Sequence, residues 1–333
     1  MSQQLSGMEI IADVVRKHYD LGNVQLPQVV PDAHQRRHRK MIVDTDSGRF
    51  LVKTYKRDPV ILDALRFQHH LSDHLARHEV PVARIQRAKD GKGIVELDTW
   101  AMELQAFVSG EPMIVNGNTL TISAKALGRF HQVCREVPVP QRDARMWRFS
   151  EVPRTPFGVL FQMAQQERPG QEVVDQCNRI ALFLHEATQE LAFDKRSEFE
   201  TGLIHGDWHG GNLLFEGDRL TAILDLEFAG DGCYLEDIAY AISNLCVRNT
   251  VDTSVLTARV HVLLDHYQLS RKLSFAEEVA LYYAVGVKHV TTVSYQSKQQ
   301  GKVAGLTAAQ WMEILSAQCT WLAHEAHKVR WGK

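Results

Sequence analysis

The hydrophobic pattern of this chain changes near residue 108, and this change limits the folds open to it. Before that point the sequence holds short runs in which apolar and polar residues alternate. HRKMIVDT and RFLVKTYK, joined by DSG, predict a β-hairpin, and GIVELD and TWAMELQAFVSG predict two further strands. Apolar residues at helical spacing predict one helix from Pro59 to His78. The first 108 residues are therefore expected to form a small antiparallel sheet that carries one helix.

Beyond residue 108 the sequence consists mainly of long amphipathic segments. They cover residues 120–135, 157–167, 171–192 and most of 252–329. One hairpin interrupts them, where the apolar runs NLLF and LTAILDL flank the turn EGD. A chain of 333 residues is long enough for two lobes. We therefore expect an α+β fold, with an antiparallel-sheet N-lobe over residues 1–108 and a mainly helical C-lobe over residues 109–333.

The composition excludes several classes of partner. Lysine and arginine (38) nearly balance aspartate and glutamate (40), so the formal net charge of -2 provides no overall field for nucleic acid or an anionic membrane. No window approaches the roughly 18 apolar residues that a membrane span needs. The five cysteines are odd in number and form no CxxC pair, which predicts reduced thiols. We expect a cytoplasmic protein without nucleic-acid or membrane partners, and the sequence leaves its oligomeric state unknown.

The segment HGDWHGGN, residues 205–212, carries the residues most suited to chemistry. Phosphoryl transfer needs a carboxylate that orients the attacking hydroxyl and a Mg²⁺ ion that bridges the phosphates. In protein kinases the catalytic Asp precedes a metal-binding Asn by five positions, and Asp207 precedes Asn212 by the same interval. A second acidic metal ligand is expected on the far strand of the following hairpin, where Asp225 stands. This spacing predicts a Mg²⁺-dependent phosphotransferase.

HGDWHGGNLL together with ILDLE resembles the signature of the aminoglycoside phosphotransferase, choline kinase and type II homoserine kinase superfamily. The resemblance extends over nearly the whole chain, through FLVKTY, VPVARI, FVSGEP, LGRFHQV and GDGCYLEDIAYAI. It implies a bilobal protein-kinase-like fold, with ATP and Mg²⁺ as cofactors and the catalytic loop and acceptor site in the C-lobe.

The same resemblance implies a role for individual residues. Asp207 would be the catalytic base, and Asn212 and Asp225 would hold Mg²⁺. The remaining implied residues are Lys53 at the α and β phosphates, Gln105 to Phe107 beside adenine, and Asp237 as a brace of the catalytic loop.

Several features leave alternatives open. His205 and His209 stand at a spacing that a zinc site can use, but three nearby glycines argue against a helix, so we expect both to be structural. The basic run HQRRHRK, residues 34–40, is either a phosphate-binding loop through Arg36 or Arg37, or a solvated turn. No GxGxxG is present, although members of the superfamily often lack it.

The charge partner of Lys53 is a second open point. The helix that should offer a glutamate to this lysine carries Gln68 at the matching position, and a neutral amide cannot neutralise a lysine. Asp63 or Asp73 would substitute, or the ion pair would be absent. Glu227, two residues after Asp225, could approach the metal or the phosphates.

The phosphate acceptor is expected to be a small hydroxylated molecule. A cationic aminoglycoside would need an acidic pocket, whereas LYYAVGVKHVTTVSYQSKQQGK is aromatic, polar and mildly basic. A choline site would need an aromatic cage, to which Tyr282, Tyr283 and Tyr295 could contribute. Our first expectation is a homoserine-like amino acid, with a sugar or amino alcohol in the same class. The alternatives are a bacterial serine/threonine protein kinase of the stress-response type and a non-catalytic nucleotide-binding module.

Overall fold

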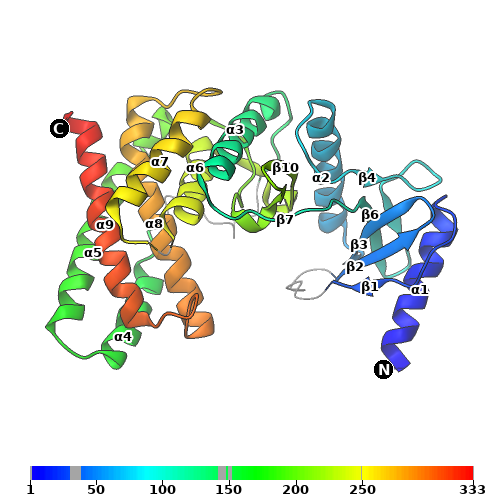
Figure 1. Cartoon of the computed structure of the whole chain (residues 1–333), viewed down its shortest axis with the longest axis horizontal. Coiled ribbons are helices and arrows are strands. Elements are labelled where there is room, and N and C mark those ends of the chain that lie inside the picture. The colour runs from blue at the N-terminus through cyan, green and yellow to red at the C-terminus, as the bar shows by residue number, and fades with distance from the viewer. Residues whose placement is uncertain (1, 31–38, 142–147, 149–151, 249, 333) are drawn as a thin grey trace. The chain divides into compact units, whose positions relative to one another are not determined.

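The computed structural model of the protein describes residues 2–30, 39–141, 148, 152–248 and 250–332. The chain forms two compact units (Figure 1). Unit 1 comprises Met1–Glu111 and Leu214–Glu227, and unit 2 comprises Pro112–Leu213 and Phe228–Lys333. The second segment of unit 1 contains the hairpin that the sequence analysis assigned to residues 109–333. Both units together have the expected α+β composition.

Unit 1 is built on an antiparallel sheet with the strand order β1-β2-β3-β6-β4, in which β5 also pairs with β6. Its strands are β1 (Gln28–Val29), β2 (Arg39–Thr45), β3 (Gly48–Lys56), β4 (Ile85–Gln86), β5 (Ile94–Glu96) and β6 (Trp100–Ala106). The predicted hairpin is confirmed, because Thr45 of β2 pairs with Gly48 of β3 across a two-residue turn. Gly48 has a φ of 124°, a backbone conformation that would be strained in a residue with a side chain.

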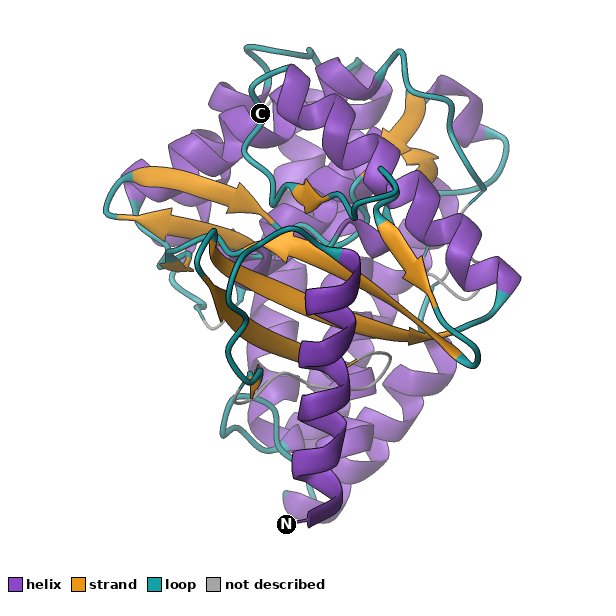
Figure 2. Cartoon of the chain, turned by 90° about the vertical axis from the view of Figure 1, so that its right-hand side faces the viewer, coloured by secondary structure: helices purple, strands orange, loops and turns teal. Residues whose placement is uncertain are grey.

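Two helices belong to this unit. Helix α1 (Ser2–His18) lies across one face of the sheet (Figure 2), where Ile11 and Val15 join the hydrophobic core formed with strand residues such as Val52. Helix α2 (Pro59–Arg77) matches the predicted helix. It begins where the side chain of Asp58 accepts a hydrogen bond from the Val60 N–H, with proline at the first helical position.

The returning segment of unit 1 carries β9 (Leu213–Glu216) and β10 (Arg219–Ile223), the predicted second hairpin. Three contacts hold it against the rest of the unit. Ser109 Oγ donates to Glu216 at 2.6 Å, Thr221 Oγ1 donates to the Ser109 carbonyl at 2.9 Å, and the Ile223 N–H donates to the Pro81 carbonyl at 2.8 Å. Residues just after β10 are therefore held near the sheet of unit 1.

Unit 2 is mainly helical, as predicted. Its helices include α3 (Gly117–Cys134), α4 (Arg154–Glu167), α5 (Gln171–Glu190), α6 (Tyr234–Ala241), α7 (Thr253–Tyr267), α8 (Phe275–Gln300) and α9 (Ala308–Trp331). Two short strands, β8 (Thr201–Ile204) and β11 (Gly230–Cys233), pair antiparallel, while β7 (Glu111–Pro112) holds the point at which the chain passes from unit 1 to unit 2. A π-helical stretch, Ile242–Val247, continues α6, and such stretches are frequent at functional sites.

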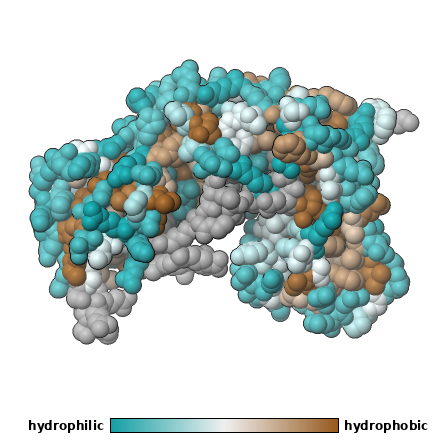
Figure 3. All heavy atoms as spheres, turned by 180° about the vertical axis from the view of Figure 1, so that it is seen from behind, coloured by the Kyte–Doolittle hydropathy of each residue, from teal (hydrophilic) through white to brown (hydrophobic). Residues whose placement is uncertain are grey.

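Within the described ranges, no helix is long and apolar enough to cross a bilayer. On the face drawn in Figure 3, hydrophilic residues cover most of the surface and hydrophobic residues are interspersed in small groups. All five cysteines are free and four of them are buried, which agrees with the expected reduced thiols.

Candidate active site

The loop that follows β8, residues 205–212, is held from beneath by Asp237 of α6. The Asp237 carboxylate accepts the backbone N–H of His205 at 2.6 Å and that of Gly206 at 2.7 Å. It is fully buried and also accepts from His131 Nε2 at 3.0 Å. Burial alone would raise its pKa, but the hydrogen bond from His131 holds the pKa of Asp237 below its usual value. The predicted brace of this loop is confirmed.

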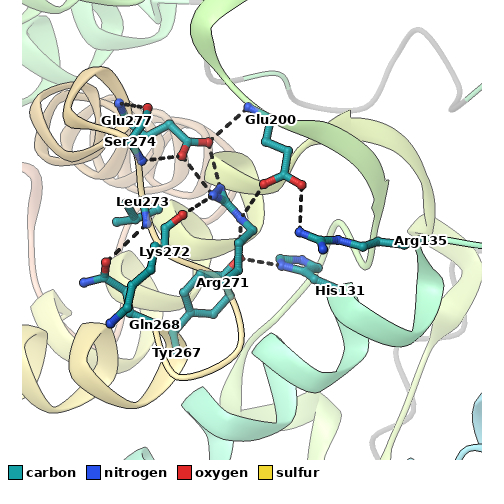
Figure 4. Close-up of polar contacts among 10 residues, drawn as sticks. All are labelled: His131, Arg135, Glu200, Tyr267, Gln268, Arg271, Lys272, Leu273, Ser274 and Glu277. Carbon is teal, nitrogen blue, oxygen red and sulfur yellow. Dashed lines mark hydrogen bonds and ion pairs between the residues drawn. The ribbon is translucent and has the colours of Figure 1, made fainter.

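A buried polar chain continues behind this brace (Figure 4). His131 Nδ1 lies 2.9 Å from the hydroxyl of Tyr267, and Arg271 Nε donates to the same hydroxyl at 3.1 Å. Arg271 also forms two hydrogen bonds to Glu277, at 2.7 and 2.8 Å. Burial lowers the pKa of His131 and so favours its neutral form, with the proton on Nε2 facing Asp237 and Nδ1 accepting from Tyr267. The Tyr267 hydroxyl then donates to His131 and accepts from Arg271, so this network supports the loop through Asp237.

Asp207 lies on this loop with its carboxylate held from three sides. The hydroxyl of Tyr240 donates to Oδ1 at 2.6 Å, Asn212 Nδ2 donates to Oδ2 at 3.0 Å, and His209 Nε2 lies 3.3 Å from Oδ2. Burial acts to raise the pKa of Asp207. The hydrogen bond and charge of His209, and the hydrogen bond from the Tyr240 hydroxyl, nevertheless hold this pKa well below its usual value. Asp207 is therefore a fixed, ionised hydrogen-bond acceptor at neutral pH.

The two histidines of the loop are structural, as expected. His205 is fully buried, and its Nδ1 accepts the Asp207 N–H at 3.2 Å. His209 caps the short 3₁₀ turn Gly210–Asn212, because its Nδ1 accepts the Gly211 N–H at 3.0 Å. Its contact with Asp207 goes further than the predicted role of shaping the loop.

The oxygen donors suit a hard cation. Asn212 uses its Nδ2 for both of its hydrogen bonds to Asp207, so the carbonyl oxygen Oδ1 is the atom that it offers to a ligand. The Asp225 carboxylate already attracts cations, namely two lysine ammonium groups. Carboxylate and amide oxygens are the ligands that Mg²⁺ takes. Within the described ranges, no group of three or more His, Cys, Asp or Glu side chains is placed to hold a metal ion.

Unit 1 contains a pocket with a cationic wall. Lys53 of β3 is buried, and its Nζ lies 3.5 Å from Asp225 Oδ1. Lys40 of β2 contacts the same carboxylate at 3.3 Å. Gln105 lines this pocket, together with the apolar side chains of Leu51 and Ile85. The pocket thus combines apolar walls with two ammonium groups, which suits a phosphorylated ligand with a flat ring.

The position of Asp225 differs from the predicted one. Strand β10 ends at Ile223, so Asp225 lies two residues beyond the strand and not within it. Its φ of 54° is in the left-handed region, which residues other than glycine rarely adopt. Such strain tends to occur where the fold fixes a functional side chain.

Lys53 forms its ion pair with Asp225, and a second carboxylate faces it from the sheet, not from the helix. Lys53 and Glu103 are opposite each other across β3 and β6, and both are buried. Burial would raise the pKa of Glu103, but the hydrogen bond from His69 of α2 and the charge of Lys53 hold it below its usual value. The suggested substitutes were wrong. Their carboxylates form ion pairs elsewhere, Asp63 with Arg66 and Asp73 with Arg87.

Phe107 and the basic run of residues 34–40 were also expected near the nucleotide. The N–H of Phe107 donates to the Arg49 carbonyl at 3.0 Å, and Phe107 is not among the residues that line this pocket. In the basic run of residues 34–40, Arg36 and Arg37 lie outside the described residues. Lys40, at the end of that run, is the member that reaches Asp225.

The fold and these side chains define a kinase-like phosphotransferase. The chain belongs to the Phosphotransferase enzyme family, whose profile matches residues 28–273. It is 26% identical over 275 residues to a homoserine kinase of Nitrobacter winogradskyi, which covers 82% of this chain and 78% of that protein. It is 25% identical over 272 residues to a homoserine kinase of a Janthinobacterium species, covering 79% and 77%.

Solved structures share the fold at low sequence identity. An aminoglycoside phosphotransferase from Alicyclobacillus acidocaldarius superposes with a TM-score of 0.73 at 16% identity, over 96% of each chain. A microcompartment-associated aminopropanol kinase superposes with a TM-score of 0.68 at 17% identity, over 96% of this chain and 99% of that one. The chain is accordingly a phosphotransferase that acts on hydroxyl groups, with the protein-kinase-like fold that its sequence predicted.

Proposed function

We propose that this protein transfers the γ-phosphate of ATP, bound with Mg²⁺, to the hydroxyl of a small molecule, and that the acceptor is a homoserine-like amino acid. The observation that carries the proposal is that the Asp207 carboxylate is ionised and is held in place by Tyr240, Asn212 and His209. A carboxylate in this state orients an acceptor hydroxyl and takes up its proton during the transfer. The curated relatives that act on homoserine support this class of acceptor.

The other residues have complementary roles in this proposal. Lys53 contacts the α and β phosphates, and Gln105 lies beside the adenine. Asn212 and Asp225 hold Mg²⁺, which supplies charge neutralisation at the phosphates when bound. Lys40 is added to the residues inferred from the sequence, because it shares the Asp225 carboxylate with Lys53.

The proposal is tested with γ-labelled ATP and purified protein in the presence and absence of Mg²⁺. The acceptors are L-homoserine, 3-aminopropan-1-ol, a sugar, kanamycin and a generic protein substrate. Labelled small product that is lost in Asp207→Asn would support the proposal. Labelled protein bands would favour a protein kinase, and nucleotide binding without transfer to any acceptor would favour a binding module.

A further inference from the structure

Unit 2 contains a second pocket, beside the loop that carries Asp207. Its walls are the C-terminal end of α6 with the π-helical stretch, and α8, two elements that pack against each other (Figure 1). Two hydrogen bonds connect it to the loop, since Tyr240 donates to Asp207 at 2.6 Å and Asn244 Oδ1 accepts the Gly210 N–H at 3.4 Å. A molecule in this pocket would therefore lie next to the catalytic loop.

The charged side chains of this pocket all have the same sign. Arg248 and Lys288 line it, and no aspartate or glutamate does so. Lys288 Nζ lies 3.9 Å from the centre of the Tyr240 ring, so one aromatic ring contacts both a lysine and the Asp207 carboxylate.

The neighbouring buried histidine responds to this positive field. His289 lines the same pocket and is almost completely buried. Burial, and after it the charge of Arg248, lowers the pKa of His289 to about 4. The pocket is therefore lined by two basic side chains, an imidazole that burial keeps neutral at neutral pH, and the polar groups of Asn244 and Ser243.

We infer that this pocket binds the acceptor through a carboxylate, which Arg248 and Lys288 receive while the acceptor hydroxyl reaches Asp207. The inference rests on the proposed function, because it names the chemical class of its acceptor. A guanidinium matches a carboxylate with two parallel hydrogen bonds, and a partly buried site strengthens such pairs. The same charges repel an aminoglycoside or a simple amino alcohol, whose groups are cationic.

A binding experiment separates this inference from the transfer reaction. The protein loaded with Mg²⁺ and the non-hydrolysable analogue AMP-PNP is titrated by ligand-observed NMR. The probes are L-homoserine and 4-hydroxybutyrate, their reduced counterparts homoserinol and 1,4-butanediol, and glycerol 3-phosphate. The two carboxylates are expected to bind, and their reduced counterparts to bind at least about tenfold more weakly, as expected for a lost charged hydrogen-bonded pair.

The variants are Arg248→Gln and Lys288→Gln, each expected to weaken the binding of both acids by about tenfold or more. Arg248→Lys keeps the positive charge but cannot form two parallel hydrogen bonds to a carboxylate, so an intermediate loss of affinity for both acids is expected. Lys298→Gln, on the exposed end of the same α8, is the matched control and should bind like the wild type. Thermal melts identify any variant that fails to fold. In that case the wild type alone tests the inference, because the binding of each acid is compared with that of its reduced counterpart.

Three results would overturn the inference: the diol binding as tightly as the hydroxy acid, neither acid binding, or glycerol 3-phosphate binding more tightly than both. Because AMP-PNP is not consumed, this outcome does not depend on turnover. Transfer of phosphate to an alcohol without a carboxylate would leave the proposed phosphate transfer from ATP intact, but it would contradict both the carboxylate inferred here and the homoserine-like acceptor of the proposed function.

Discussion

The hydroxyl of Tyr240 donates a 2.6 Å hydrogen bond to Oδ1 of Asp207. Burial, and then the adjacent Asp207 charge, raise the pKa of this tyrosine, so it stays protonated and remains a donor at any working pH. Its ring meanwhile lies beneath Lys288 at the edge of the pocket in unit 2. One side chain thus positions the inferred base and helps to form the pocket beside it.

Tyr240→Phe should lower kcat by roughly tenfold to a hundredfold, because a hydrogen bond to a charged group contributes about 1.5–3 kcal/mol. The pKa of Asp207 should rise, since the variant loses a donor to its ionised form. A pH profile of kcat/KM would therefore show an acid limb shifted upward. Tyr295→Phe, at an exposed position on α8, is the control, and an equal effect there would contradict the role of Tyr240.

Asp237→Ala should destabilise unit 2 strongly. The change leaves the buried N–H of His205 and the partly buried N–H of Gly206 without their acceptor, which costs up to about 1–3 kcal/mol for each group. Urea denaturation measures the loss. Asp252→Ala removes an exposed helix N-cap at α7 and should cost only about 1 kcal/mol. Similar losses in both variants would argue against the brace.

Glu103→Gln should also lower the free energy of unfolding, by roughly 1–3 kcal/mol, because it removes a buried charge that accepts from Tyr55 and faces Lys53. The affinity for ATP should fall as well, since Lys53 loses a partner that fixes its position. Fluorescence titration with a nucleotide analogue and urea denaturation measure the two effects. Asp63→Asn disrupts only an exposed ion pair and should change stability by less than about 1 kcal/mol.

His289 should make the protein less stable as the pH falls. Its folded pKa of about 4 lies below the unfolded value of about 6.5, so between these values the unfolded chain binds one more proton. This contribution to stability is fully present above about pH 6.5 and decreases toward pH 4, by roughly 3 kcal/mol in all. Melting temperatures at several pH values should therefore fall less steeply in His289→Gln. The exposed His185→Gln should retain the wild-type slope, and an unchanged slope in His289→Gln would contradict this account.

The sequence predicted the elements of the fold well because their signals are local. The period-2 runs around DSG and EGD became the two hairpins, and the long amphipathic segments became α3 to α5 and α7 to α9. Which compact unit the second hairpin joins depends on its hydrogen bonds with Ser109, a donor, and with the carbonyl of Pro81, an acceptor, both of which are distant in sequence. No local pattern contains that information.

The same distinction applies to the site. Asp207 and Asn212 lie on one short loop, so their spacing was sufficient to bring them together. Tyr240 could have been found, because it follows Asp237 by three positions and shares its face of α6. Glu103 could not have been found in this way. It faces Lys53 only because of the register between β3 and β6, and a single sequence does not determine the register between two strands. Arg248 follows a π-helical stretch. Because a π-helix has a different number of residues per turn from an α-helix, α-helical spacing does not predict on which face of the helix Arg248 lies.

The central claim is that Asp207 acts in phosphoryl transfer while Asp225 serves the bound nucleotide and its metal. The most direct measurement compares γ-phosphate transfer and Mg·ATP affinity in the wild type, Asp207→Asn and Asp225→Asn. Asparagine tolerates the left-handed backbone at residue 225, so this variant removes charge without adding strain. We predict that Asp207→Asn abolishes transfer to L-homoserine or another small acceptor and binds Mg·ATP nearly as the wild type does, whereas Asp225→Asn loses Mg·ATP affinity. Undiminished transfer by Asp207→Asn would contradict the account.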